Sequence, residues 1–550
     1  MDFAVFNIIM KKIVSVIALG IVLSTAASAQ TRNFKLGQWT EIQNAILKEL
    51  NTSYVDSLPL DRMERAGIDA MLESLDPYTI YIPDEEQEDL EMMLSKSYGG
   101  FGALIYKPDK DGNVIISEPY RNSPAHRLGF VAGDEITAID GVSVKGLTAT
   151  ECTEKMKGKP GTTVVFTTRH LRTGVTDDVT VTRERIHLPD VEYYGMVDDT
   201  TGYISQTGFT ANVSSEVRAA VLSLKQQGAK RLVLDLRGNG GGLLSEAVNI
   251  VSLFVPRGSL IVTQKGNGST RDYEYKTTTE PIDTQIPIIV MTDSGTASSS
   301  EIVSGTLQDL DRGTIMGTRT FGKGLVQSIR PLPYNGTLKV TTAKYYTPSG
   351  RCVQAIDYSH RNEDGSVGYI PDSLTHEFKT AHGRTVRDGG GITPDVIIEG
   401  KDYSRLTYSL VVSGVVDHFA LDFVRRHESI APIDEFRLSD EEYENFIKFA
   451  QGETFDYRSS ARTLFDQMKK ELGREGLEDA MSSELEALGK ALDMDKETFL
   501  RLKKSEIVPF LEEEIAVRYY FQEAGVQVRL RYDEQLHKAL QSPMINVSEE

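Results

Sequence analysis

The sequence is poor in cysteine, in tryptophan and in positive charge. Its 550 residues include two cysteines and one tryptophan, and 60 Lys and Arg stand against 80 Asp and Glu, which gives a formal net charge of −20 at pH 7. This acidity argues against a nucleic-acid-binding protein, because neutralising phosphates requires clustered Lys and Arg. Two cysteines that lie far apart, Cys152 and Cys352, do not define a disulfide, and we expect both to be buried thiols.

Long apolar runs are also missing, except near the N-terminus. There Lys11 and Lys12 precede "IVSVIALGIVLSTAASAQ", which ends in the small residues Ala27 to Ala29. The pattern predicts a secretory signal peptide over residues 1–29, cleaved before Gln30, and a membrane anchor is the alternative. We therefore expect secretion across the inner membrane, with the mature chain soluble in the periplasm or the cell envelope.

The hydrophobic pattern divides the rest of the chain into regions that differ in their predicted secondary structure. Helical periodicity predicts an N-terminal helical region over 30–90, where Ile42, Ile46 and Leu50 fall four apart, and a charged helical extension over 401–550. In that extension Ser439 and Glu442 have the spacing of a capping box. The predicted regions are 30–90, 91–185, 186–400 and 401–550. Within the last region a further apolar stripe, which indicates core or an oligomer contact, consists of Leu464, Met468 and Leu472.

Residues 91–185 read as short β-strands broken by Gly, Asn and Asp. Three pieces of this stretch, "YGGFG", "SPAHRLGFVAGDEITAIDG" and "GTTVVFTTR", resemble a PDZ domain. The resemblance implies a β-barrel-like domain that adds a peptide as an extra strand, with the loop at Gly100, Phe101 and Gly102 holding the peptide's terminal carboxylate. A glycine-rich hairpin without a ligand is the alternative for "YGGFG" alone.

Residues 186–400 alternate apolar strands with helical patterns, which predicts α/β architecture with a partly parallel sheet. Within this region "DSGTASSSEI" follows the strand "IPIIVM" and leads into a helix. Of its four hydroxyls, on Thr296, Ser298, Ser299 and Ser300, we favour Ser298 as a nucleophile, because the helix start places N–H groups near a developing oxyanion.

A serine nucleophile needs a base, and none of the nine histidines stands in a recognisable triad context. Lysine can serve if burial lowers its pKa, and Lys323 lies between two glycines in "TFGKGLVQ". Gln327 could orient the amine without adding a negative charge. Taken singly, Ser298 reads as a plain helix cap and Lys323 as a solvated turn charge.

The motifs "LDLRGNGGG", "GTASSSEI", "TFGKGLVQ", "TTAKYYTPSGR" and "GGGITPDV", in this order after the PDZ stretch, resemble the carboxyl-terminal processing peptidases, or tail-specific proteases. The resemblance covers roughly residues 40–400 and implies a crotonase-like α/β protease core. It implies that Ser298 is the nucleophile, Lys323 the base and Gln327 its support. For the oxyanion hole it implies the N–H of Ser299 and a glycine of the "GNGGG" loop, for which we choose Gly241.

We therefore expect a serine endopeptidase that recognises protein C-terminal tails and uses neither a metal nor an organic cofactor. An adaptor protein and a homo-oligomer formed through the helical regions are compatible with the sequence. The alternative is a catalytically silent PDZ scaffold that binds C-termini in the cell envelope. A trypsin-like protease is disfavoured, since Gly240 occupies the place where "RGNGGG" would need its serine.

Overall fold

The computed structural model describes residues 33–267, 272–362, 365–456 and 459–544. The predicted signal peptide over 1–29 lies outside the described residues. The chain divides into two compact units, Met1–Tyr81 and Ile82–Glu550.

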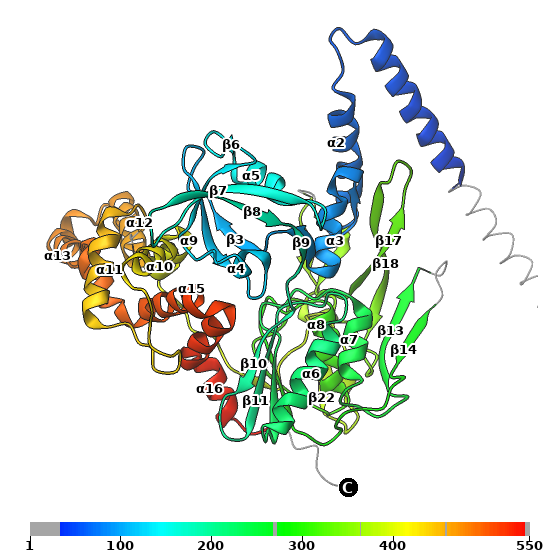
Figure 1. Ribbon diagram of the computed structural model, residues 1–550. Helices are drawn as coiled ribbons and strands as arrows, with labels where there is room; N and C mark the ends of the chain where they lie inside the picture. Colours follow the sequence, from blue (N-terminus) through cyan, green and yellow to red (C-terminus); the bar gives the residue numbers. More distant parts are fainter. Residues whose placement is uncertain (1–32, 268–271, 363–364, 457–458, 545–550) are drawn as a thin grey trace, which may run out of the picture. The chain divides into compact units, whose positions relative to one another are not determined.

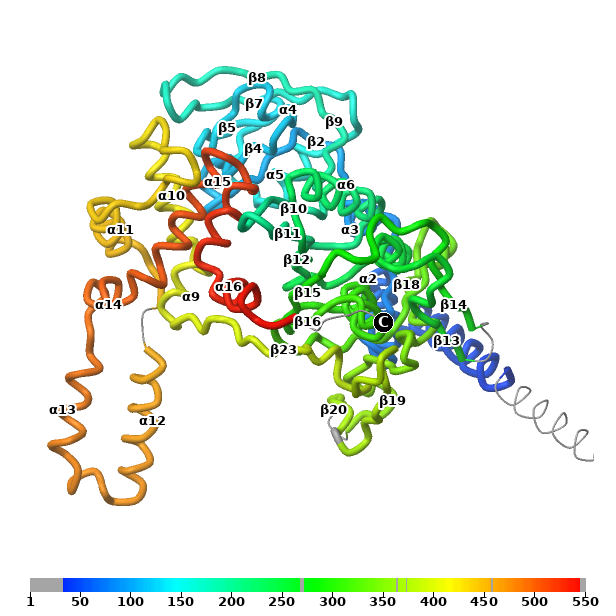
Figure 2. The backbone as a smooth tube through the Cα atoms, turned by 90° about the horizontal axis from the view of Figure 1, so that it is seen from below, coloured from blue at the N-terminus to red at the C-terminus, as the bar shows by residue number. Residues whose placement is uncertain are grey.

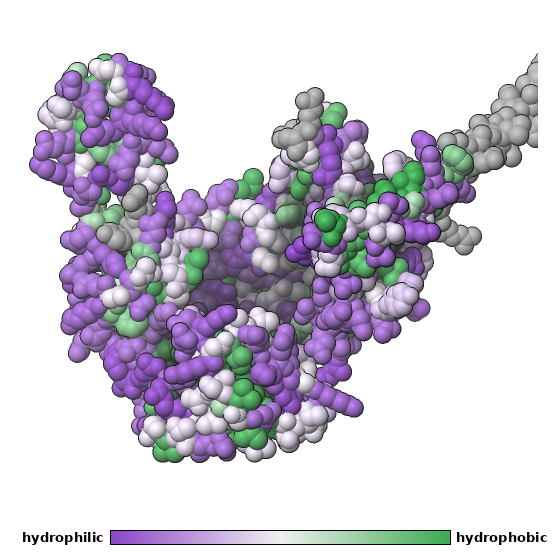
Figure 3. All heavy atoms as spheres, turned by 90° about the horizontal axis from the view of Figure 1, so that it is seen from above, coloured by the Kyte–Doolittle hydropathy of each residue, from purple (hydrophilic) through white to green (hydrophobic). Residues whose placement is uncertain are grey.

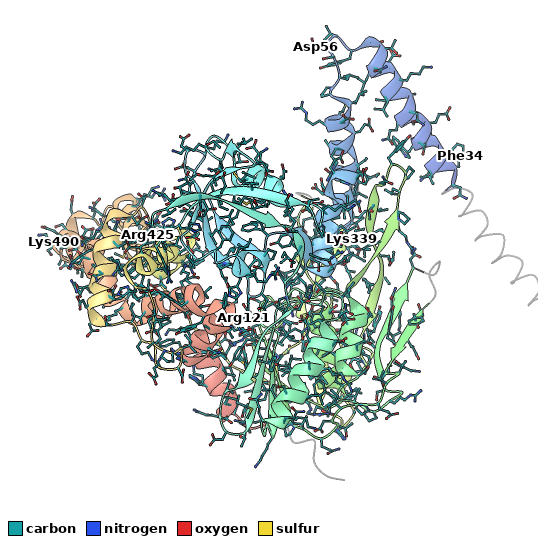
Figure 4. All side chains as sticks on the ribbon, viewed as in Figure 1. Phe34, Asp56, Arg121, Lys339, Arg425 and Lys490 are labelled. Carbon is teal, nitrogen blue, oxygen red and sulfur yellow. The ribbon has the colours of Figure 1, made fainter. Side chains whose placement is uncertain are left out.

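The described part of the first unit is a helical hairpin. A helix over residues 33–53 is followed by α2 (Leu60–Glu73), and Figure 4 labels Phe34 near the start of the first helix and Asp56 in the turn. The predicted helices are thus present, but many of their apolar side chains are exposed, among them Phe34, Trp39, Ile46, Met71 and Leu75. Figure 3 shows hydrophobic residues among the hydrophilic ones at the surface of the molecule.

The PDZ region is built on an antiparallel sheet with strand order β3-β4-β5-β7-β8. Its core is aromatic, with Phe101 packed edge-to-face on Phe166 and Phe130. β3 lies at the end of this strand order, so one of its edges pairs with no other strand among the described residues. The elements are α3 (Gln87–Ser95), β2 (Ser97–Gly100), β3 (Ala103–Tyr106), β4 (Val114–Pro119), α4 (Pro124–Arg127), β5 (Glu135–Ile139), β6 (Val142–Ser143), α5 (Ala149–Met156), β7 (Thr163–Arg169), β8 (Thr176–Thr182) and β9 (Glu184–His187), which pairs with β2.

The core sheet has the order β10-β11-β12-β15-β16-β23. β10 is antiparallel to β11, and the other neighbours are parallel, which confirms the predicted partly parallel sheet. Helices α6, α7 and α8 pack on one face of it (Figure 1). The elements are β10 (Val191–Met196), β11 (Thr201–Gln206), α6 (Val213–Gln226), β12 (Arg231–Asp235), α7 (Leu244–Val251), β15 (Ile288–Thr292), α8 (Ser299–Asp309), β16 (Thr314–Gly317) and β23 (Val396–Ile397).

A second, antiparallel sheet carries the strand that follows Lys323. Here β18 pairs with β17 on one side and with β13 on the other, and β14 pairs with β13. Two short hairpins, β19 with β20 and β21 with β22, follow in the chain. The bounds are β13 (Leu260–Gly266), β14 (Tyr273–Lys276), β17 (Leu325–Pro331), β18 (Thr337–Tyr346), β19 (Ile356–Arg361), β20 (Val367–Tyr369), β21 (Glu377–Lys379) and β22 (Thr385–Arg387).

The C-terminal region is helical, as predicted. Ser439 accepts a hydrogen bond from the Glu442 amide at 3.1 Å, which confirms it as the cap of α11. The stripe Leu464, Met468 and Leu472 does not form core, because Phe465 is the buried residue of its helix. The helices are α9 (Arg405–Val412), α10 (Val415–Arg426), α11 (Asp440–Gly452), α12 (Ser460–Arg474), α13 (Ser482–Leu492), α14 (Lys496–Leu502), α15 (Lys504–Tyr532) and α16 (Glu534–Gln541).

Two further features bear on the sequence predictions. Both cysteines are free thiols, but only Cys152 is buried, and Cys352 is half-buried. In the part of the chain that the structure describes, no single helix is long and apolar enough to cross a bilayer, and α9 and α10, which meet that criterion as a pair, are bent by 61°.

Candidate active site

Ser298 occupies a sharp turn between strand β15 and helix α8. Its backbone has φ 57° and ψ −115°, a left-handed conformation that is strained for a residue with a Cβ. Strain of this kind persists only where the surrounding structure enforces it, and it is concentrated at functional sites. The strained backbone therefore indicates a functional role for Ser298.

The four hydroxyls of the turn have different surroundings. Thr296 Oγ1 donates to the Leu236 carbonyl at 2.8 Å, and Ser300 Oγ donates to the Asn239 carbonyl at 2.9 Å. Ser299 Oγ donates to the Gly242 carbonyl at 2.9 Å. These three residues are buried, whereas Ser298 is half-buried and lines a cavity. The geometry thus favours Ser298 among the four candidates.

The cavity has a volume of about 320 Å³ and brings the predicted active-site residues together. Its wall includes residues from the 238–242 loop after β12, from the turn before α8, and from β17. Such convergence of distant segments on one hollow is typical of a binding or catalytic site. The predicted residues that line it are Gly241, Ser298, Ser299, Lys323 and Gln327.

Glu301 ties the serine turn to the loop that carries Lys323. Its Oε2 accepts hydrogen bonds from the amides of Ser298 and Lys323, both at 2.8 Å. Its Oε1 accepts from the Gly322 amide at 2.8 Å and from Thr320 Oγ1 at 2.6 Å. The carboxyl is fully buried, and burial raises its pKa while the four donated hydrogen bonds oppose the rise. Glu301 thus joins the segment that carries Ser298 to the segment that carries Lys323.

Strand β17 places Gln327 in the cavity wall just after a register shift in its pairing with β18. Bulges of this kind often redirect a side chain beside an active site. Gln327 Nε2 donates to Thr341 Oγ1 of β18 at 3.2 Å.

Two residues of β18 belong to the site although the sequence did not single them out. Tyr345 is buried, and its hydroxyl donates to the Ser298 carbonyl at 3.1 Å, so this hydrogen bond stabilises the serine turn. Lys339, labelled in Figure 4, is a second lysine in the cavity wall, and burial lowers its pKa. Lys339 is therefore a rival to Lys323 for the role of base.

The predicted oxyanion residues lie against each other. A Cβ added to Gly241 would come within 2.8 Å of both Ser298 Cβ and the Ser299 nitrogen, so a glycine is required for this close approach. The Gly241 amide, however, donates to Asn239 Oδ1 at 2.9 Å. A role for Gly241 in the oxyanion hole therefore requires this hydrogen bond to open when a substrate binds.

The predicted carboxylate loop lies at the end of β2 and before β3, and its residues do not line the cavity. Gly100 ends β2, and Gly102 has φ 77° with Ser123 so close that a Cβ would meet it at 2.4 Å. The carbonyls of Phe101 and Gly102 accept hydrogen bonds from the amides of Ala125 and Tyr120, both at 2.9 Å. The loop is thus fixed by its carbonyl oxygens to the start of α4 and the segment before it.

Comparison with known families matches three parts of the chain. Residues 200–360 match the model of peptidase family S41, and residues 115–169 match a PDZ domain. Residues 406–542 match a C-terminal helical domain described for probable PDZ-proteases.

Comparison with single proteins finds similar sequences in bacteria. The chain is 35% identical over 316 residues to a carboxy-terminal-processing protease of Bartonella bacilliformis, across 56% of this chain and 71% of that protein. It is 33% identical over 314 residues to a probable CtpA-like serine protease of Staphylococcus aureus, across 57% of this chain and 62% of that protein. Among solved structures, the photosystem II D1 C-terminal processing protease matches 64% of this chain and 86% of its own, with 27% identity and a TM-score of 0.34.

Proposed function

This chain belongs to peptidase family S41, and from that premise we propose that it is a serine endopeptidase that recognises protein C-terminal tails through its PDZ domain. The observation that carries the proposal is the shared cavity of Ser298 and Lys323, whose backbone amides are held by one carboxylate, that of Glu301. A scaffold that only binds tails needs none of these contacts. We also propose that the protease core is of the crotonase-like type.

The proposed reaction proceeds through an acyl-enzyme. Ser298 Oγ attacks the scissile carbonyl carbon and gives its proton to the neutral amine of Lys323, with Gln327 as orienting partner. The amides of Ser299 and Gly241 stabilise the negative oxygen. Lys323 then passes the proton to the leaving amine, the C–N bond breaks, and the same lysine deprotonates the water that releases the acyl group.

Tail recognition makes cleavage depend on a free substrate carboxylate. A peptide substrate with an amidated C-terminus is expected to show a KM at least about 10-fold higher than the free acid, because the PDZ loop loses its charged ligand. Initial rates on a matched pair of peptides that differ only at this group measure the effect. Equal KM values for the two peptides would reduce the PDZ domain to a spacer.

The compartment and the partners form part of the same proposal. The leader predicted over 1–29 would direct the chain across the inner membrane, so its substrates would be proteins of the periplasm or the cell envelope. An adaptor that delivers tails to the PDZ domain is compatible with this arrangement.

We propose that two copies associate through the N-terminal hairpin, where Trp39 and Ile46 are 66% and 53% exposed. Changing both residues to Glu is expected to convert the wild-type oligomer into a monomer, as measured by light scattering after gel filtration. The matched control changes Leu464 and Met468 of α12 to Glu. A monomer produced by the control pair, and not by the hairpin pair, would move the contact to α12.

A further inference from the structure

The last helices of the chain cover the second face of the core sheet. Side chains of a strand alternate between its two faces, and the strand residues that turn away from α6, α7 and α8 pack on Val526, Leu536 and Ala539 of α15 and α16. Figure 2 shows α16 running beside the strands. Parallel sheets are normally buried on both faces, so these helices complete the protease core. The strand residues of this second face are Tyr203, Val233, Ile289, Met291 and Met316.

At the end of α15, Asp533 forms an ion pair with Arg237, which follows β12. Arg237 Nη2 lies 2.5 Å from Asp533 Oδ2, and Arg237 Nη1 donates to Asp533 Oδ1 at 3.2 Å. Gln535 Oε1 accepts from Arg237 Nη1 at 2.8 Å. The two ion-paired side chains are 19% and 10% exposed, so water screens the contact only weakly. The pair stands in the wall of a cavity of about 470 Å³ between α15, α16 and the ends of β11 and β12.

Arg237 opens the glycine loop of residues 238–242 that faces Ser298. The Gly238 amide donates to Asp293 Oδ1 at 2.8 Å, and the Ala297 amide donates to the Asn239 carbonyl at 3.0 Å. These two hydrogen bonds join the first residues of the loop to the serine turn, and Arg237 connects the start of the loop to the C-terminal helices.

Asp235 binds the same guanidinium from the strand that precedes it. Its contacts with Arg237 Nε, both at 3.0 Å, come from a residue two positions earlier in the same chain segment. Asp235 Oδ2 also lies 2.5 Å from Arg237 Nη2 and accepts a hydrogen bond from the Tyr203 hydroxyl of β11 at 2.7 Å, so Asp235 holds the guanidinium to the core sheet. Asp533 belongs to a separate element, so it fixes the direction in which the guanidinium, and with it the start of the loop, points.

We propose that Asp533 is a positioning residue for the 238–242 loop, and hence that the C-terminal helical region completes the active site. The inference rests on the proposed peptidase function, since it concerns the oxyanion side of that reaction. Loss of the ion pair would let the loop shift relative to Ser298, and a displacement of about 1 Å at a reacting centre can cost roughly 100-fold in rate.

The variant Asp533→Asn separates this role from helix capping. Asp533 Oδ1 also accepts from the Leu536 amide at 2.8 Å as the cap of α16, and Asn is an equally good cap. The matched control is Glu534→Gln, which removes the same charge from the neighbouring residue, whose partner is Lys401 at 3.2 Å.

Three probes measure the effect of each variant. A peptide substrate gives kcat and KM. A peptide boronate, which forms a tetrahedral anion on the serine, reports the oxyanion side, and the product peptide reports ground-state binding.

For Asp533→Asn we expect kcat to fall roughly 10- to 100-fold with KM changed less than about 3-fold. The boronate should lose affinity by the same factor, the product peptide should bind as before, and Asp533→Glu should recover part of the rate. Unchanged kcat in Asp533→Asn, or equal losses for boronate and product peptide, would overturn the inference. A wild-type protein that cleaves nothing would overturn the proposed function itself.

Discussion

Replacing Lys323 by alanine is expected to lower kcat by roughly 10³- to 10⁶-fold while the protein remains folded. Without the amine, no group in the reaction as proposed removes the Ser298 proton. The Lys323 backbone amide, which donates to Glu301, is kept in the variant, so the loop should retain its place. Cleavage of an unstructured protein such as casein, with the fragments read by mass spectrometry, measures the loss.

Lys339 provides the matched control, since it lines the same cavity as Lys323 and burial lowers the pKa of Lys339. Lys339→Ala should retain turnover within about 10-fold of the wild type, because the Lys339 amine takes no part in the proposed reaction. Ser298→Ala should be as inactive as Lys323→Ala. If Lys339→Ala were inactive and Lys323→Ala active, Lys339 would be the base. Equal cleavage by wild type and Ser298→Ala would point to a contaminant or to another serine, with Ser299→Ala as the next variant.

Glu301→Gln is expected to lose both activity and stability. Each carboxylate oxygen accepts two hydrogen bonds, so in either orientation of the amide an NH₂ group faces two donors. With the site fully buried, the mismatch should lower the free energy of unfolding by about 2–4 kcal/mol. Because Glu301 aligns Ser298 with Lys323, kcat of the folded fraction should fall by about 100-fold. Urea unfolding and active-site kinetics measure the two effects separately.

Glu506→Gln controls for the loss of a hydrogen-bonded, half-buried carboxylate elsewhere. Glu506 Oε2 accepts from the Ser404 amide and from Thr407 Oγ1, both at 3.0 Å, within the C-terminal helices. Its change should reduce stability and leave kcat as it is. A Glu301→Gln protein that is destabilised yet turns over at the wild-type rate would limit Glu301 to a structural role.

Much of the site could be predicted because its signals are local. The strand, turn and helix around Ser298 lie within about 20 consecutive residues, and hydrophobic periodicity resolves such segments well. The partly parallel sheet followed from the alternation of strands and helices, and the structure confirms it. Lys323 and Gln327 were identified through a family resemblance, and their roles remain predictions.

What the sequence missed depends on contacts between distant segments. The four donors of Glu301 become neighbours only when the loop after β16 folds back on α8. Tyr345 and Lys339 reach the cavity because β18 pairs with β17 in one particular register, which single-sequence periodicity does not fix. In α12 the regular spacing of Leu464 and Met468 was real, but nothing packs on that face in the described chain, so both are exposed.

The cavity of about 470 Å³ beside Arg237 has a pharmacological consequence. It is lined by Phe510, Glu513 and Arg529, none of which lines the cavity that holds Ser298. A small molecule bound there would lie outside the cavity that Ser298 and Lys323 line. If it separated Arg237 from Asp533, we expect it to act as a noncompetitive inhibitor. Its selectivity would come from the C-terminal helices, because peptidases without this domain lack these lining residues.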